Sequence, residues 1–102
     1  MGGEYIIYIL KERKLNKMTQ HLYAVLLGGK LRENHLMEDH HLVFVVAESE
    51  KSARVLAKKK WQAEEVHIDG TQRIEQVDGY EIILEKSAGD ESRLSTNPNY
   101  SL

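Results

Sequence analysis

Two short apolar runs constrain the fold of this chain more than any other feature of its sequence. Residues 21–27 and 42–47 are apolar almost throughout, and neither run alternates between polar and apolar side chains. A strand with one face in water alternates, so these runs predict strands that are apolar on both faces. We therefore expect both strands to lie in the centre of a sheet.

The first run is followed by two glycines. Gly28-Gly29 and then Lys30 resemble the start of a phosphate-binding loop, whose free amides and lysine hold an anion. Such a loop continues directly into a helix, whereas residues 30–41 are polar and lack a helical period. We expect a glycine turn and a long loop, with Gly28, Gly29 and Arg32 as candidate contacts for a small carboxylate or phosphate.

The next segment has the features of a capped helix. The Ser49 hydroxyl can accept from open backbone amides, Glu50 lies at the positive end of the helix dipole, and residues 58–60 are lysines at the negative end. Its apolar side chains recur at helical spacing: Ala53, Leu56, Ala57 and Trp61. The pattern predicts a helix over residues 50–61, with Trp61 as an anchor in the core.

Strand signals resume after this helix. Residues 65–68 are followed by two β-type runs, 73–77 and 80–84, which flank Asp78-Gly79. An Asp-Gly pair is a strong hairpin signal because glycine accepts a positive φ. The sequence therefore predicts an α+β fold: a mixed sheet of about five strands with one main helix on one face, containing a β-α-β unit and a C-terminal hairpin.

The 102 residues suffice for one domain. We assign this domain to residues 18–86, with an N-terminal extension over 1–17 and a flexible tail over 87–102. One hypothesis is that Met18 is the native start and that the extension is read-through. Detection of residues 1–17 by mass spectrometry of the native protein would exclude it.

One helix covers only one face of a sheet, and here both faces are predicted to be apolar. Leaving about half a dozen aliphatic side chains in water would forfeit on the order of 10 kcal/mol, which is comparable to the stability of a small domain. We therefore expect a homodimer that packs through the second sheet face. The N-terminal segment and the long loop are alternative covers.

The composition excludes several classes of protein. Fourteen Lys and Arg against sixteen Asp and Glu give a net charge of −2, which argues against a charge-driven nucleic-acid partner. The chain has no cysteine and thus no disulfide, thiolate nucleophile or cysteine zinc site. Its longest apolar run, residues 5–10, is far shorter than a membrane span. We expect a cytoplasmic protein without a nucleic-acid or membrane partner.

Histidines and carboxylates provide the one candidate for a metal site. Imidazole and carboxylate together suit zinc, iron or manganese, and residues separated by one position share a side of a strand. The candidate ligands are Glu38, His40, His67 and Asp69. Their spacing matches no strong ligand motif, and a solvated loop with a hydrogen-bonded strand histidine explains the same residues.

Several short motifs occur in an order that resembles a known family. They are Leu22-Tyr23-Ala24-Val25-Leu26-Leu27-Gly28-Gly29, Glu38-Asp39-His40-His41-Leu42-Val43-Phe44-Val45-Val46, Trp61, His67-Ile68-Asp69 and Val77-Asp78-Gly79-Tyr80. Over roughly residues 22–84 the chain resembles the bacterial family called domain of unknown function 1543. The resemblance implies an intracellular bacterial setting and no particular activity. The family tends to place His-Asp before the second strand, where this chain has His40-His41.

No nucleophile stands out, because Ser49 and Ser52 are better explained by helix capping. We therefore expect a non-enzymatic binding or interaction module that forms homo-oligomers and needs no cofactor. The alternative is a metal-dependent enzyme in which Glu38, His40, His67 and Asp69 hold a divalent ion.

Overall fold

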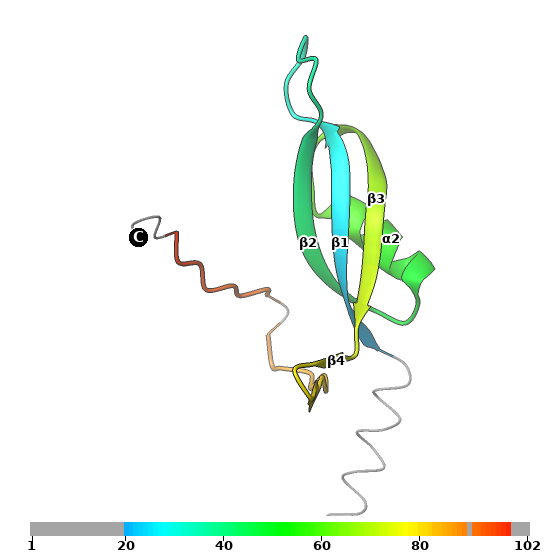
Figure 1. Ribbon diagram of the computed structural model, residues 1–102, viewed down its shortest axis with the longest axis vertical. Helices are drawn as coiled ribbons and strands as arrows, with labels where there is room; N and C mark the ends of the chain where they lie inside the picture. The colour runs from blue at the N-terminus through cyan, green and yellow to red at the C-terminus, as the bar shows by residue number, and fades with distance from the viewer. Residues whose placement is uncertain (1–19, 90, 99–102) are drawn as a thin grey trace, which may run out of the picture.

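The computed structural model describes residues 20–89 and 91–98, so the predicted extension over residues 1–17 lies outside the described part. Figure 1 shows the long strands side by side, with the helix behind them. The elements are, in chain order, β1 (His21–Lys30), β2 (Asp39–Ala47), α2 (Glu50–Lys59), β3 (Glu64–Ile74), β4 (Gln76–Val77) and β5 (Tyr80–Glu81).

The predicted α+β class is confirmed, but the strands form two sheets instead of one. The larger sheet has the order β2-β1-β3 with both pairs antiparallel, and β4 and β5 form a separate two-stranded sheet. Since β2 and β3 both run opposite to β1, they are parallel to each other, and β1 lies between the two strands of the predicted β-α-β unit. The prediction that the second apolar run is central was wrong, because β2 lies at an edge.

The predicted glycine turn was also wrong. Strand β1 continues through Gly28 and Gly29 to Lys30, and these glycines pair with His40 and Asp39 of β2. Among the described glycines only Gly79 has a positive φ, so neither residue is needed here for a turn conformation. The loop between β1 and β2 is accordingly shorter than predicted.

Strand β3 is longer than the sequence indicates and contains a β-bulge. Leu26 pairs with Gly70 and Leu27 pairs with Ile68, which leaves Asp69 as an extra residue. Because side chains alternate along a strand, one extra residue exchanges the two faces beyond it. Ile68 therefore packs against the core, while Asp69 joins the side chains of the opposite face.

The helix α2 begins as predicted and covers one face of the larger sheet (Figure 1). The Ser49 hydroxyl accepts from the backbone N–H of Ser52 at 3.2 Å. Ala53 and Ala57 are fully buried against the sheet. Trp61 is partly buried against the core, as predicted, but Leu56 remains 39% exposed and is not a core residue. The buried core consists of Tyr23, Val25, Leu27, Val43, Val45, Ala47, Ala53 and Ala57.

The C-terminal hairpin is confirmed, although its strands are short. Asp78 and Gly79 have φ values of 51° and 83°, as a tight two-residue hairpin turn requires. The N–H of Ile82 donates to the carbonyl of Glu75 at 2.9 Å beyond the paired residues. Tyr80, which follows the turn, is 77% exposed. Among the described residues, no helix has the length and apolarity that crossing a membrane requires.

Candidate metal centre

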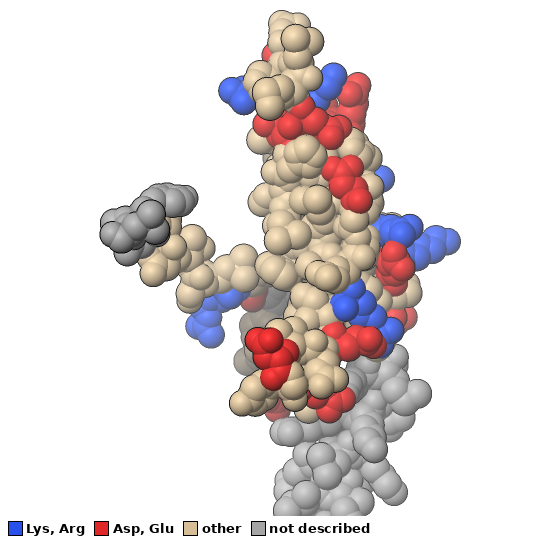
Figure 2. All heavy atoms as spheres, in the orientation of Figure 1, with Lys and Arg blue, Asp and Glu red and all other residues tan. Residues whose placement is uncertain are grey.

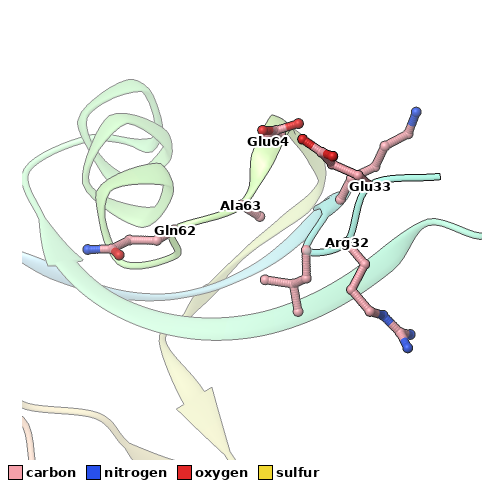
Figure 3. Close-up of a pocket in the computed structure, with 7 residues that line it drawn as sticks. Arg32, Glu33, Gln62, Ala63 and Glu64 are labelled. Atoms are coloured by element: carbon pink, nitrogen blue, oxygen red, sulfur yellow. The ribbon is translucent and has the colours of Figure 1, made fainter. Parts of the chain in front are cut away.

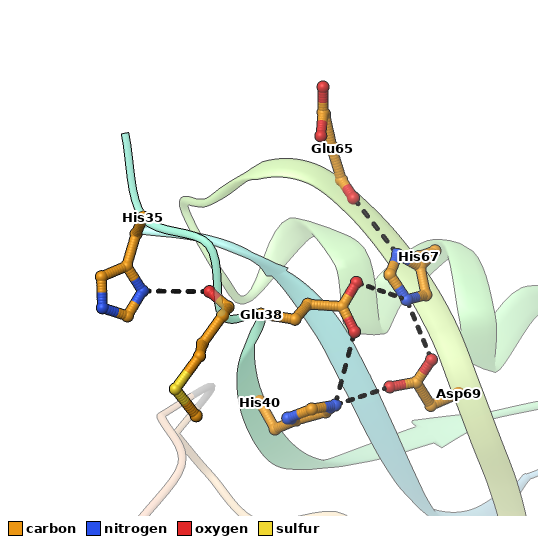
Figure 4. Close-up of polar contacts among 7 residues, drawn as sticks. His35, Glu38, His40, Glu65, His67 and Asp69 are labelled. Atoms are coloured by element: carbon orange, nitrogen blue, oxygen red, sulfur yellow. Dashed lines mark hydrogen bonds and ion pairs between the residues drawn. The ribbon is translucent and has the colours of Figure 1, made fainter. Parts of the chain in front are cut away.

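Four polar side chains meet on the face of the larger sheet opposite α2. Glu38 ends the loop before β2, His40 lies in β2, and His67 and Asp69 lie in β3. Nε2 of His67 is 2.9 Å from Asp69 Oδ1 and 3.2 Å from Glu38 Oε1. Nε2 of His40 is 3.2 Å from Asp69 Oδ2 and 3.5 Å from Glu38 Oε2. Figure 4 shows the two rings directed at the same pair of carboxylates.

The strand register explains why these residues converge. Gly28 of the central strand pairs with His40 on one side and with His67 on the other. Glu38 and Asp69 are each two positions from a histidine, and such residues project from one side of an extended chain. The β-bulge at Asp69 sets this side for β3. In a regular strand His67 and Ile74, seven positions apart, would lie on opposite faces, and the extra residue brings them to the same face.

Gly28 provides the space in which the cluster forms. A Cβ atom at this position would lie 2.7 Å from both His67 Nε2 and Asp69 Oδ2, and 3.0 Å from Glu38 Oε2. Real Cβ atoms essentially never approach other atoms as closely as 2.7 Å. Any other residue at position 28 would therefore displace the polar ends of the cluster.

The main chain fixes the orientation of the His67 ring. Its Nδ1 lies 3.3 Å from the carbonyl oxygen of Glu65, and a carbonyl can only accept, so this contact places a proton on Nδ1. A ring with its proton on Nδ1 can present the Nε2 lone pair to a metal ion, whereas a ring that also carries a proton on Nε2 donates to the two carboxylates. A histidine that binds a metal commonly has this arrangement, with its second nitrogen donating to a carbonyl. Glu65 itself has a φ of 53°, an uncommon conformation at the second irregularity of the β1–β3 register.

The separations within the cluster suit a transition metal. In a tetrahedral zinc site with bonds of about 2.0–2.1 Å, neighbouring ligand atoms are about 3.3 Å apart. The four nitrogen–oxygen contacts span 2.9–3.5 Å, and the two histidines contact different oxygens of each carboxylate. Glu38, His40 and Asp69 each offer one ligand atom, and these three atoms lie within 4.8 Å of one another. His67 is outside that group of three but contacts both of its carboxylates.

Stability alone explains this cluster poorly. The four side chains are between 27% and 52% exposed, and exposed ion pairs typically contribute about 0–1 kcal/mol. A glycine within a strand costs roughly 0.5–1 kcal/mol relative to alanine. Gly28 therefore lowers the stability of the sheet, and the polar contacts for which it makes room compensate for little of this loss.

The other predicted ligand residues lie apart from the cluster. Gly29 faces α2, where a Cβ would lie 3.1 Å from the Trp61 ring. Arg32 Nη2 is 4.0 Å from Asp39 Oδ1. The hollow in Figure 3 is lined by Lys30 and Arg32 and also by Glu33 and Glu64, so its two positive charges are balanced by two negative ones. The structure therefore does not join Gly29 or Arg32 to the histidines.

Two further histidines have separate surroundings. The ring of His41 lies 5.6 Å from that of Trp61 on the face of α2, and His35 Nδ1 contacts the carbonyl of Met37 at 3.0 Å. The sequence reasoning missed the part that Gly28 plays beneath the cluster. The patterns Glu38-x-His40 and His67-x-Asp69 indicate the four candidate ligands, but no sequence pattern indicates the role of Gly28.

The fold and this cluster define a small α+β domain with a histidine and carboxylate site on the open face of an antiparallel sheet. Residues 35–84 match a family described as Domain of Unknown Function (DUF1543), which confirms the resemblance over those residues. The matched segment includes Glu38, His40, His67 and Asp69, and it begins after Gly28. No curated protein and no solved structure matches the chain.

Proposed function

We propose that this domain binds a divalent transition metal ion, with Glu38, His40 and Asp69 as core ligands and His67 completing the set. The observation that carries the proposal is the convergence of two histidines and two carboxylates above a glycine that has no room for a side chain. Two ionised carboxylates with neutral imidazoles carry a charge of −2, which a divalent cation balances.

The donor atoms favour zinc, iron or manganese over calcium or magnesium. Calcium takes six to eight oxygen ligands, and magnesium keeps several waters and few protein ligands. A site with two nitrogens and two carboxylate oxygens instead resembles the mixed ligand sets of zinc and of non-haem iron. Zinc is therefore the first probe.

We favour a binding role over catalysis, and this role requires His67 to join Glu38, His40 and Asp69 on the ion. When four protein ligands complete a tetrahedral shell, no coordination position remains for a substrate, whereas catalytic zinc sites keep a position for water. The position of His67 outside the group of three supports the alternative of a metal-dependent enzyme, in which three residues hold the ion and His67 contacts a bound water. Cobalt substitution separates these cases, because four-coordinate and higher-coordinate cobalt differ in visible absorption.

The direct test is calorimetric titration of the full chain, purified without a histidine tag, with zinc chloride. We expect saturable binding that His40→Ala lowers at least tenfold, since truncating a ligand removes a metal bond. Manganese is titrated in parallel, and calcium is the negative control. His35→Ala is the matched control variant, because His35 contacts a loop carbonyl outside the cluster.

Two outcomes would overturn this proposal. The first is the absence of saturable binding of any transition metal by the wild-type chain. The second is equal binding by the wild-type and His40→Ala chains. In either case the cluster would be a hydrogen-bonded network and not the metal site proposed here.

A further inference from the structure

The outer edge of β3, the side that faces away from β1, is a second candidate binding site. β3 is the last strand of the larger sheet, and among the described residues no strand pairs with this edge. We propose that the edge binds an extended acidic peptide segment of a partner protein, which adds to the sheet as a strand next to residues 70–74. This proposal goes beyond metal binding and does not depend on it.

Beyond the β-bulge, this edge is regular. Residues 70–74 pair one to one with residues 22–26 of β1 without a register shift. The outer edge of such a strand presents N–H and C=O groups that can pair with an added chain. Among the described residues, no side chain forms a hydrogen bond with the main chain of residues 70–74. The opposite edge of the sheet differs, because Nζ of Lys60 donates to the carbonyl of Phe44 in β2 at 2.6 Å.

Helix α2 extends under the position that an added strand would occupy. Figure 1 shows the helix crossing behind the sheet and projecting beyond β3. One hollow between the two elements is lined by Arg54, Val55 and Lys58 of α2 and by residues 68–71 of β3. A fourth strand at this edge would therefore pack one of its faces on α2, as the three strands of the larger sheet do.

A second hollow continues along the same edge. It is lined by residues 48–50 at the start of α2 and by Tyr23, Thr71 and Arg73. Since Thr71 lines both hollows, together they follow β3 from Ile68 to Arg73, a distance of roughly 17 Å. That length suits an extended chain of about five residues better than a single small anion.

The Thr71 hydroxyl lacks a partner at the point that the two hollows share. Its Oγ1 is buried and forms no hydrogen bond in the described part of the chain. Burying a hydroxyl without a partner costs stability. A side chain opposite Thr71 on an added strand would have its Cβ about 4.5–5.5 Å away, within reach of this hydroxyl. A carboxylate at that position would accept the missing hydrogen bond.

The charge of the first hollow favours an acidic segment. Arg54 Nη2 lies 2.6 Å from Glu50 Oε1, whereas Lys58 has no ion-pair partner among the described residues. The carboxylate of Asp69 contacts the two histidines of the polar cluster instead. Figure 2 shows blue side chains, with red ones beside them, on the side of the molecule where α2 projects. Lys58 thus leaves a positive charge that a carboxylate of the bound segment can balance.

A second copy of this chain fits the edge less well. Two β3 strands paired around a two-fold axis would bring the projecting parts of two α2 helices toward each other. Each helix carries Lys51, Arg54 and Lys58 as exposed residues, so like charges would meet. An acidic peptide meets no such repulsion.

Fluorescence anisotropy of a labelled peptide of about eight residues, in which valine and glutamate alternate, tests the site with the full chain at low ionic strength. We expect saturable binding that Lys58→Glu weakens at least tenfold, because an attraction becomes a repulsion. Lys59→Glu is the matched control. It changes the net charge equally on the same helix, but Lys59 lines neither hollow, so this variant should bind the peptide as wild type does.

Two further peptides separate strand addition from general attraction. In one, lysine replaces each glutamate. In the other, proline replaces each valine and removes N–H groups that a paired strand needs. We expect both to bind at least tenfold more weakly than the valine and glutamate peptide. Equal binding of either peptide would overturn the proposal.

Arg54→Glu is a second test at the same hollow, and it keeps the proposal falsifiable if Lys58→Glu fails to fold. The proposal is overturned if the valine and glutamate peptide shows no saturable binding, or if wild type and a folded variant bind it equally. Displacement of the peptide by inorganic phosphate, but not by chloride of equal ionic strength, would indicate a small-anion site instead. A dimeric wild-type chain that binds no peptide would indicate a second copy at the edge.

Discussion

The absence of a side chain at Gly28 determines which groups fit on the open face of the larger sheet. At Gly28 the three atoms nearest to a built Cβ are the polar ends of Asp69, His67 and Glu38. All three are side-chain atoms, and none belongs to the backbone. The neighbouring Gly29 differs, because its Cβ would meet the backbone oxygen of Glu64 at 3.0 Å. Gly28 thus leaves room for the polar cluster on one face, and Gly29 permits close packing on the other.

Gly28→Ala should therefore separate metal binding from stability. We expect zinc affinity to fall at least tenfold, because the methyl group pushes the ligand ends apart, while the free energy of unfolding stays within about 1 kcal/mol of the wild-type value. Calorimetric titration and urea denaturation of the same preparation measure the two effects. Gly70→Ala is the matched control, since its Cβ would have no neighbour within 4 Å. Equal zinc affinity in Gly28→Ala and wild type would contradict the role assigned to Gly28.

Part of the site could be predicted at this scale. The spacing of His67 and Asp69 indicates a shared strand face, and residue chemistry selects Glu38 and His40 as candidate partners. The role of Gly28 could not be predicted, because it follows from the register of three strands. Only that register places one glycine between two histidines that lie 27 positions apart in the sequence.

At the scale of elements, the β-bulge in β3 matters most for the site. Residues 64–74 form one strand, although Gly70, Thr71 and Gln72 resemble a loop in the sequence. Pairing with β1 on a buried sheet overrides that weak local preference. The bulge then allows Val66 and Ile68 to reach the core while His67 and Asp69 remain outside. Sequence periodicity alone could not locate it, since a bulge is a property of paired strands.

Helix α2 is the element that the sequence predicted best. Its start follows from a local contact, the Ser49 hydroxyl with the N–H of Ser52, so no tertiary information was needed. Its end at Lys59 falls before the predicted Trp61, because the N–H groups of Lys60 and Trp61 bond in a final turn to Ala57 and Lys58.

Ser49→Ala tests this cap. We expect the free energy of unfolding to fall by about 1 kcal/mol, because the substitution leaves a helix amide without its side-chain acceptor. Urea denaturation followed by circular dichroism measures the change. Ser52→Ala is the control, as Ser52 supplies the amide through its backbone, and we expect its effect to be smaller. A loss in Ser52→Ala equal to that in Ser49→Ala would contradict the capping role.

At the scale of the whole molecule, the two faces of the larger sheet carry different kinds of side chains. One face buries eight residues against α2 and forms the core. The other has exposed apolar side chains of β1 and β2 along much of its length, and the histidine and carboxylate cluster at the end near the loop. The prediction that both faces are apolar was correct for β1 and β2, because their runs do not alternate. It could not show that β2 lies at an edge, since both central and edge strands can be apolar on two sides.

The most direct measurement is an anomalous difference map at the zinc absorption edge from a crystal of the full chain grown with zinc. We expect a peak between the Glu38, Asp69 and His40 side chains, with bonds of about 2.0–2.2 Å and the Nε2 atom of His67 on the same ion. A map without a peak among these four residues, with zinc elsewhere or at no site, would contradict the assignment of a metal centre.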